Sequence, residues 1–241
     1  MVDPKALAQS LFFVVNRPRA YDEADGLDRN KRMTEDKKGH MTGTATDITT
    51  VDNHPEINSL QPLGNVHHAA YRCRDAEQTR WFYEEVLGLP LAAAMVFDAL
   101  PGTGKKSDYM HLFFELGDGN FIAFFDEPET AKPEHFARKD SFDLHIALEA
   151  DSFESMLAWQ ARVIACGKSC LGPVDHGFVH SVYMYDPNGI QVEITCKDEH
   201  YDSIMAADGA VAHEQLKNWT DRTREAKASR FGSAALNKRG H

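Results

Sequence analysis

The stretch VHHAAYRCRDAEQTRWFYEEVLGL (66–89) decides the fold, because a second stretch, FDLHIALEADSFESMLAWQARVIACG (142–167), repeats its pattern. Each stretch begins with a short apolar run typical of a β-strand and continues with apolar residues at helical spacing. Each helical segment then ends at a glycine, Gly88 in the first copy and Gly167 in the second. The repeat predicts one strand followed by one helix, twice along the chain.

Residues that cap helices stand at the start of both helical segments. In the first copy Asp75 and Gln78 form a plausible capping pair, and in the second Asp151 and Glu154 can do the same. Further strand-like runs follow each helix, with the turn sequences GDG and DPNG between them. These runs are YMHLFFEL (109–116), NFIAFFD (120–126), HSVYMYD (180–186) and IQVEITC (190–196). The repeated unit is therefore one strand, one helix and about three strands.

These units define the predicted domain organisation. We expect an α+β fold in which paired βαβββ modules, at about 63–127 and 141–198, form an open curved sheet with a cleft. Residues 1–62 are rich in charge and predict an N-terminal arm. Residues 199–241 predict a helical C-terminal tail around 212–230, which either packs by one apolar stripe or forms a dimer contact.

Composition and charge argue against several classes of function. The chain has 26 Lys and Arg against 37 Asp and Glu, a formal charge of −11, which opposes nucleic-acid binding through phosphate neutralisation. No apolar run approaches the roughly 18 residues of a membrane span, and the N-terminus does not have the pattern of a signal peptide. Four cysteines without a CxxC pair favour reduced thiols. We therefore expect a soluble, cytoplasmic protein that binds neither nucleic acid nor membrane.

Three residues in strand-like segments carry metal-binding groups, namely His68, His145 and Glu193. Two imidazoles and one carboxylate are the ligand set of mononuclear non-haem iron sites, which leave coordination positions open. When two modules lie side by side, the inward-facing residues of the first and last strands of each module are expected to converge. Aligning the glycines of the two turns places Ala123 opposite Glu193, so three of the four pseudo-symmetric ligand positions are filled.

Two other histidines compete for the first ligand position. His67 is adjacent to His68, and since neighbouring strand residues point to opposite faces, only one of the two can enter the cleft. The spacing from His68 to Asp75 favours His68 as the ligand. His111 lies in a later strand-like run of the first module and is more readily explained as a structural histidine than as a fourth ligand.

With these residues the chain resembles the vicinal oxygen chelate superfamily. This superfamily includes glyoxalase I, type I extradiol dioxygenases, fosfomycin-resistance thiol transferases and bleomycin-binding proteins. HAAYRCRDAEQTRWFYEEVLGL (68–89) is similar to its opening strand and helix, and YMYDPNGIQVEI (183–194) is similar to its closing strand. The resemblance covers about residues 64–198. It implies the paired-module fold and a metal held by the two histidines and the glutamate named above.

The ligand positions separate the subgroups of this superfamily. Glyoxalase I carries a carboxylate where Ala123 stands, and bleomycin-binding proteins lack the metal ligands, so the resemblance disfavours both. Extradiol dioxygenases and fosfomycin transferases share two histidines and one glutamate. The extradiol subgroup further implies a tyrosine ten residues before the ligand glutamate, where Tyr183 stands, and a histidine shortly before it, for which His176 and His180 are candidates. A second acid–base histidine of that subgroup has no counterpart near the start of 120–126.

The resemblance to the extradiol subgroup implies a metal-dependent dioxygenase that cleaves a catecholic ring with O2. Fe(II) is the expected cofactor, with Mn(II) or another divalent metal as an alternative. His176 would transfer a proton, and Tyr183 would hydrogen-bond an oxygen of the substrate. The candidates to line a cleft for a flat ring are Phe113, Phe121, Phe124 and Phe178. The expected partners are a small aromatic substrate, O2 and a second copy of the chain in a homodimer.

Two alternatives keep the fold and change the function. In the first, a divalent metal acts as a Lewis acid in a glyoxalase-like or thiol-transferase-type enzyme, and the transferase predicts a cationic cluster near the site. The candidate cations are Lys105, Lys106, Arg138, Lys139 and Lys168. In the second alternative the protein binds a small aromatic ligand without catalysis. Consumption of oxygen during turnover distinguishes the dioxygenase from both.

Overall fold

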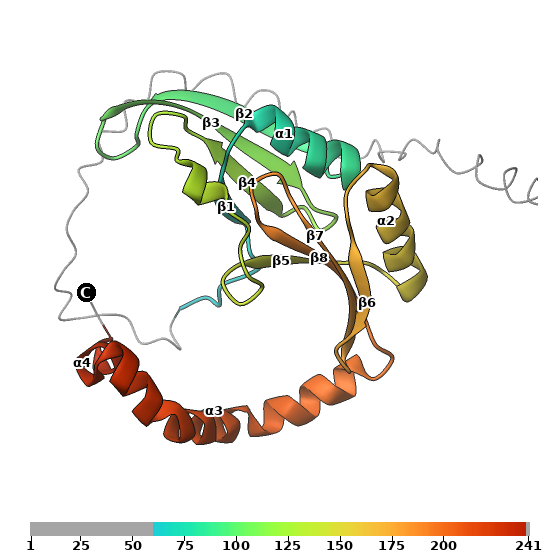
Figure 1. Ribbon diagram of the computed structural model, residues 1–241, viewed down its shortest axis with the longest axis vertical. Helices are drawn as coiled ribbons and strands as arrows, with labels where there is room; N and C mark the ends of the chain where they lie inside the picture. Colours follow the sequence, from blue (N-terminus) through green and yellow to red (C-terminus); the bar gives the residue numbers. More distant parts are fainter. Residues whose placement is uncertain (1–59, 240–241) are drawn as a thin grey trace, which may run out of the picture. The chain divides into compact units, whose positions relative to one another are not determined.

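The computed structural model describes residues 60–239, which Figure 1 colours along the chain. The predicted N-terminal arm at 1–62 therefore lies almost entirely outside the described residues. The described part consists of two βαβββ modules followed by a helical tail. The predicted α+β class and the repeat of the βαβββ unit are confirmed.

The two modules contain the same elements in the same order. The first is built from β1 (His68–Cys73), α1 (Ala76–Arg80) with a π-helical extension (Trp81–Val86), β2 (Leu91–Ala99), β3 (Lys106–Glu115) and β4 (Phe121–Asp126). A short 3-10 helix (Pro133–Phe136) leads to the second, built from β5 (His145–Glu149), α2 (Phe153–Ala165), β6 (Leu171–Asp175), β7 (Val179–Tyr185) and β8 (Gln191–Lys197). The tail consists of α3 (Tyr201–Phe231) and α4 (Ser233–Asn237).

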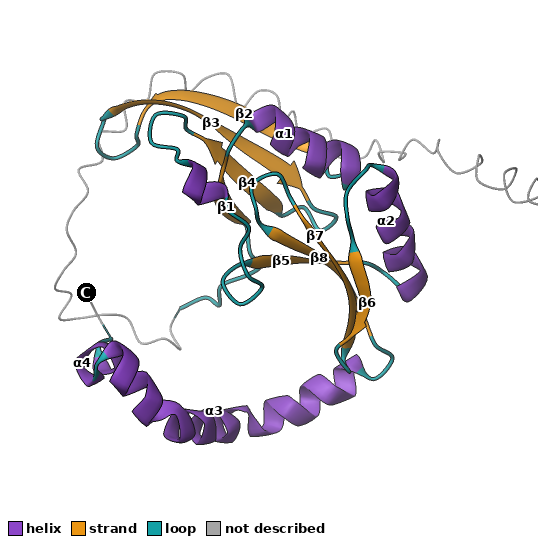
Figure 2. Ribbon diagram, viewed as in Figure 1, coloured by secondary structure: helices purple, strands orange, loops and turns teal. Residues whose placement is uncertain are grey.

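Each module forms one four-stranded sheet, and Figure 2 distinguishes these strands from the helices. The strand orders are β1-β4-β3-β2 and β5-β8-β7-β6. In both sheets the first and last strands of the module pair in parallel, and the remaining pairs are antiparallel. The two sheets are separate, because no hydrogen-bonded ladder joins β1 to β5 in the described part of the chain. Strands β1 and β5 are thus free edges.

Alternation along the strands decides which side chains enter the core. Successive residues of a strand face opposite sides of its sheet, so Leu112 and Phe114 of β3 are buried together with Phe124 of β4. The ring of Tyr83 lies 5.4 Å from Phe114 and 4.8 Å from Phe124, which places this face of the sheet against the first helix. The second module repeats the arrangement with Met156, Val163, Val182, Val192 and Ile194. His68 of β1 and His145 of β5 lie on the opposite face of their sheets.

The modules are joined through the turn between β7 and β8. Asn188 accepts a hydrogen bond from the backbone N–H of Arg74 at 2.8 Å and donates one to Thr79 Oγ1 at 3.2 Å. Tyr83 donates its hydroxyl hydrogen to Asp186 at 3.2 Å. All of these groups except Arg74 belong to buried residues, and a buried polar group that loses its partner costs about 1–3 kcal/mol. The DPNG turn therefore connects the second module to the helical side of the first.

The observed N-cap residue agrees with the prediction in the first module and differs from it in the second. Asp75 caps α1, as predicted, and its side chain accepts from the N–H of Gln78. In the second module the predicted cap, Asp151, is wrong, because the N-cap of α2 is Ser152, which accepts from the N–H of Ser155 at 3.1 Å. The cap must immediately precede the first helical residue and have extended backbone. Ser152 meets both conditions, with φ −157°.

The tail helix is longer than the sequence pattern indicates. It begins at Tyr201, well before 212, and no residue of α3 is buried. Leu216 and Trp219, two members of the predicted apolar stripe, are 62% and 50% exposed. Packing of this stripe is therefore not observed in the described residues. None of the described helices, α3 included, is long and apolar enough to cross a membrane.

The turns that end in Gly119 and Gly189 offer a matched test of the packing between modules. Both glycines have positive φ, +84° and +79°. A Cβ on Gly119 would meet nothing within 4 Å, whereas one on Gly189 would lie 2.6 Å from the carbonyl oxygens of Phe136 and Ala137. We expect Gly119→Ala to lower the free energy of unfolding by about 1–2 kcal/mol, through the left-handed backbone alone.

Gly189→Ala adds a backbone clash to the same conformational cost, and overpacking costs a further 1–3 kcal/mol, roughly. The total loss is therefore expected to be about 2–5 kcal/mol. Urea denaturation of the two variants measures the difference. Equal losses would contradict the close approach of Gly189 to the chain at Phe136 and Ala137.

Candidate metal centre and ligand pocket

The strand registers relate the two modules residue by residue. Glu193 pairs with the residue two positions after His145, and Ala123 pairs with the residue two positions after His68. These registers agree with the alignment that places Ala123 opposite Glu193. Ala123 is fully buried, so the first module has an apolar methyl group where the second has a carboxylate.

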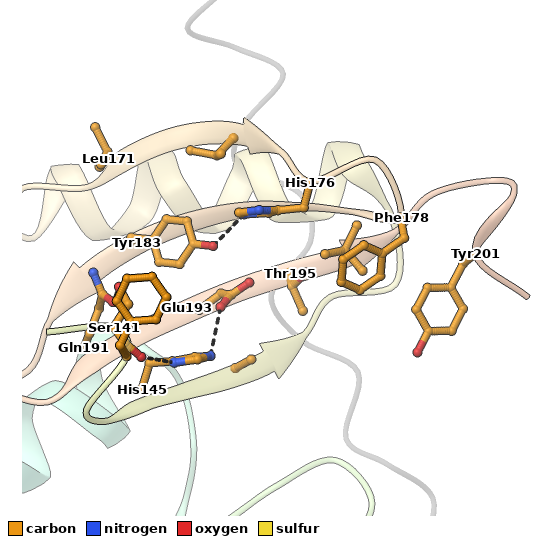
Figure 3. Close-up of a pocket in the computed structure, with 14 residues that line it drawn as sticks. Ser141, His145, Leu171, His176, Phe178, Tyr183, Gln191, Glu193, Thr195 and Tyr201 are labelled. Atoms are coloured by element: carbon orange, nitrogen blue, oxygen red, sulfur yellow. Dashed lines mark hydrogen bonds and ion pairs between the residues drawn. The ribbon is translucent and has the colours of Figure 1, made fainter. Parts of the chain in front are cut away.

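His145 and Glu193 lie together on the exposed face of the second sheet (Figure 3). His145 Nε2 is 3.7 Å from Glu193 Oε2. The other ring nitrogen, Nδ1, is 2.8 Å from the carbonyl oxygen of Ser141. Because a carbonyl oxygen only accepts, Nδ1 carries a hydrogen, and Nε2 is the ring nitrogen on the side of Glu193. The imidazole is thus oriented as a metal ligand requires.

A buried serine orients the carboxylate. Ser181 is fully buried and donates its hydroxyl hydrogen to Glu193 Oε1 at 2.5 Å. Oε1 is therefore occupied, and Oε2 is the oxygen that faces His145. A typical metal–ligand distance is about 2.1 Å for both groups, so one cation can contact Nε2 and Oε2 across their 3.7 Å separation. These two donors fit a divalent metal.

His68 lies elsewhere, on β1 of the other sheet. Its Nδ1 is 2.8 Å from Nδ1 of His67, and its ring centroid is 5.6 Å from Phe113 and 6.3 Å from His111. Within residues 60–239, no three His, Cys, Asp or Glu side chains are grouped closely enough to hold a metal. The structure therefore brings together two of the three predicted ligands within one chain and leaves His68 apart from them.

His176 and Tyr183 form a hydrogen-bonded pair beside the carboxylate. His176 Nε2 is 2.7 Å from Tyr183 Oη. Burial raises the pKa of Tyr183, and the nearby charge of Glu193 raises it further. The competing histidine, His180, is not part of the pocket lining, and its Nε2 lies 3.4 Å from Asp198. Of the two candidates, His176 is the one that the fold directs into the site.

A pocket of about 740 Å³ surrounds these groups. Its walls are mostly apolar, and no Lys or Arg belongs to them. The lining residues are Ser141, Phe142, His145, Ala147, Leu171, Val174, His176, Phe178, Val179, Tyr183, Gln191, Glu193, Thr195 and Tyr201. A pocket with apolar walls and a few convergent polar groups is the usual form of a small-molecule site.

The predicted aromatic lining is divided among three places. Phe178 lines the pocket, as expected. Phe113 and Phe121 lie near the histidines of the first module, with Phe113 beside His68 and Phe121 beside His67. Phe124 is fully buried in the core, because its strand parity directs it to the helix side.

Two residues of the candidate site, Ser181 and Ser141, are not predicted by the sequence motifs. The strand pattern does indicate the first of them. Ser181 precedes Tyr183 by two residues on β7, so the period of a strand places both on one face. Ser141 acts through its backbone carbonyl, and a carbonyl has no signal in the sequence.

The contact between Ser181 and Glu193 predicts a specific loss. We expect Ser181→Ala to weaken binding of a divalent metal by about 10–100-fold, because hydrogen bonds to metal ligands typically contribute that much. Titration with Mn(II) or Co(II) measures the change. Ser203→Ala, in the exposed tail helix, is the control and should bind as the unaltered protein does. Equal affinity of the two variants, with both folded by circular dichroism, would contradict the role of Ser181.

The chain is similar to several solved structures. A glyoxalase/dioxygenase from Nostoc punctiforme has 27% identity and a TM-score of 0.44, covering 62% of this chain and all of that one. A lactoylglutathione lyase from Agrobacterium tumefaciens has 23% identity and a TM-score of 0.39, covering 56% of this chain and 95% of the other. The fosfomycin resistance protein FosX from Listeria monocytogenes has 18% identity and a TM-score of 0.43, covering 58% and 98%.

No curated protein matches the chain. The family model for the Glyoxalase/Bleomycin resistance protein/Dioxygenase superfamily matches residues 65–194. This range contains both modules from β1 to most of β8, together with all the predicted site residues. The chain belongs to the Glyoxalase/Bleomycin resistance protein/Dioxygenase superfamily.

Proposed function

We propose that the protein is a metal-dependent extradiol-type dioxygenase that cleaves a catecholic ring with O2. The observation that supports this most directly is the pair His176–Tyr183, joined at 2.7 Å, in the same apolar pocket as His145 and Glu193. A hydrogen-bonded histidine–tyrosine pair beside two metal donors can transfer a proton to or from a bound diol.

The metal of this proposal is Fe(II), with Mn(II) or another divalent ion as an alternative. His145 and Glu193 would hold it, together with His68. When bound, such an ion supplies a Lewis acid that lowers the pKa of a chelating diol, and iron or manganese adds redox chemistry with O2.

The side chains of the pocket bind and orient the substrate. Because the pKa of Tyr183 is raised, its phenol stays protonated at neutral pH and can donate a hydrogen bond to a substrate oxygen. His176 then accepts or returns a proton at Nε2 through the Tyr183 hydroxyl. Phe142 and Phe178 provide apolar surface for a flat ring and exclude water from it.

The third ligand is proposed to come from a second copy of the chain. His68 and His145 both lie on free edge strands, β1 and β5, and unpaired edges readily pair with another chain. Large apolar side chains precede both strands and are exposed, with Val66 at 70% and Phe142 at 100%. A homodimer that sets β1 of one copy beside β5 of the other covers these residues and brings His68 to Glu193 and His145.

The pocket favours an uncharged aromatic substrate over the anionic substrate of a thiol transferase. None of the five cations considered for a transferase lines the pocket. Two of them are positioned over aromatic rings instead, Arg138 over Tyr185 and Lys168 over Phe82. The Lewis-acid alternative remains an outcome of the activity test.

The activity test is oxygen uptake by protein reconstituted anaerobically with Fe(II) and offered a panel of catechols. We expect uptake with a ring-opened product, and its loss in Glu193→Ala, since removing a ligand removes the metal. Glu199→Ala, an exposed glutamate outside the pocket, is the control and should keep full activity. No uptake from any catechol, with metal demonstrably bound, would contradict the dioxygenase and favour Lewis-acid chemistry.

Coexpression of two inactive variants tests whether the site is shared. His68→Ala and Glu193→Ala remove ligands that the proposal assigns to different copies, so a mixed dimer regains one intact site of its two. With random assembly, half of the dimers are mixed, and we expect about a quarter of the unaltered metal content and activity to return. If both ligands came from one chain, mixing would restore nothing.

A further inference from the structure

A second cavity lies on the first module, on a different sheet from the pocket around His145. Its volume is about 320 Å³, which is within the range of small-ligand sites, roughly 300–1,000 Å³. It lies between the turn that joins β2 to β3 and the ends of β1 and β4. The residues that line it are Arg72, Leu100, Pro101, Tyr109, Phe125 and Glu127.

An ion pair forms the polar wall of this cavity. Arg72 donates from Nη1 to the carboxylate of Glu127 at 2.7 Å and to its carbonyl oxygen at 2.8 Å, and from Nη2 to Thr130 Oγ1 at 3.1 Å. A guanidinium has five N–H donors, so two of them are not used in these bonds. Hydrogen bonds from Thr130 and from Arg72 lower the pKa of Glu127 to about 2, so the pair is neutral overall at neutral pH.

Aromatic side chains form a continuous row from His68 to the cavity. The ring of His68 lies 5.6 Å from Phe113, which lies 4.2 Å from His111. His111 in turn stacks on Phe125 at 3.8 Å, and Phe125 lies 5.9 Å from Tyr109. All five residues alternate with the core residues of β1, β3 and β4, so they share the face of the sheet that is turned away from the helix.

His111 forms the middle of the row, between Phe113 and Phe125. Within the described structure, Nε2 of His111 is buried without a hydrogen-bond partner. The imidazole stacks on Phe125 and is tilted against Phe113, so the row presents a series of flat rings, which suits an aromatic ligand.

We infer that this row and its cavity bind the far end of an elongated, uncharged aromatic substrate, with a distal oxygen that accepts a hydrogen bond from Arg72. The inference rests on the proposed function for the reacting end of the substrate at His68. His68 and Arg72 are four residues apart on β1, or about 13 Å at the rise of a strand. Two rings joined by a two-carbon bridge span this length, whereas a single catechol does not.

Binding of trans-4-hydroxystilbene tests the cavity without any turnover. This probe has the length and the distal oxygen but no diol. Leu100 is 38% exposed at the rim of the cavity, so Leu100→Trp is expected to fill it and to weaken binding at least about tenfold, or 1.4 kcal/mol. Ile164→Trp adds the same side chain to an exposed position of α2 and should bind as the unaltered protein does.

Unchanged affinity of Leu100→Trp for the probe would overturn the inference. Analytical ultracentrifugation of the same variant then shows whether the substitution also disrupts the dimer. Loss of binding together with loss of the dimer would also overturn the inference, because the cavity face would then be a contact between copies rather than a ligand site.

Turnover separates this inference from the proposed function. With Fe(II) bound, Leu100→Trp should raise KM for 3,4,4′-trihydroxystilbene about tenfold and leave KM for catechol unchanged, because only the longer diol reaches the cavity. Equal effects on both diols would contradict the inference while the dioxygenase stands. Probe binding that Leu100→Trp abolishes, with no oxygen uptake from either diol, would contradict the dioxygenase while the cavity stands.

Discussion

The turn Asp186–Gly189 connects the two modules, and the position of the candidate site depends on it. Asn188 bonds to the backbone and to Thr79 at the start of the first helix, and Tyr83 donates to Asp186. Burial raises the pKa of Asp186 and raises that of Tyr83 well above its usual value. The phenol therefore remains a donor over the whole physiological range. These groups lie on the helical side of the first module, so the modules contact each other there. Strands β1 and β5 remain the free edges of their sheets.

Because the modules contact each other through the β7–β8 turn, the predicted ligand His68 lies apart from His145 and Glu193. His145 and Glu193 are neighbours because β5 and β8 pair in parallel, with the histidine two residues before the partner of the glutamate. The same register on β1 and β4 directs His68 to the equivalent position of a different sheet. Each module thus positions its own predicted ligands, His68 in the first and His145 with Glu193 in the second.

Much of the fold could be predicted from the sequence, because its signals are local. Glycines with positive φ at the turns, alternation in the strands and the cap at Asp75 all depend on residues close in the chain. Strand parity also directs His180 away from the face of Ser181 and Tyr183 once β7 is known, whereas His176 lies between β6 and β7 and parity does not place it. What could not be predicted is the separation of His68 from the other ligands. It depends on contacts between residues about a hundred positions apart, such as Tyr83 with Asp186.

Ala123 stands in the first module where Glu193 stands in the second, and this difference sets the two faces apart. In the second module the buried carboxylate of Glu193 accepts a hydrogen bond from Ser181, and under the proposed function a cation would compensate its burial further. In the first module the equivalent position, Ala123, is a buried methyl group, so no carboxylate stands there. Aromatic side chains cover that face instead, from Phe113 through His111 to Phe125. Under the proposed function, one face of the duplicated unit would serve metal chemistry and the other would recognise a flat molecule. A ligand that contacts both faces would then be aromatic along its length and would carry its metal-binding oxygens at one end.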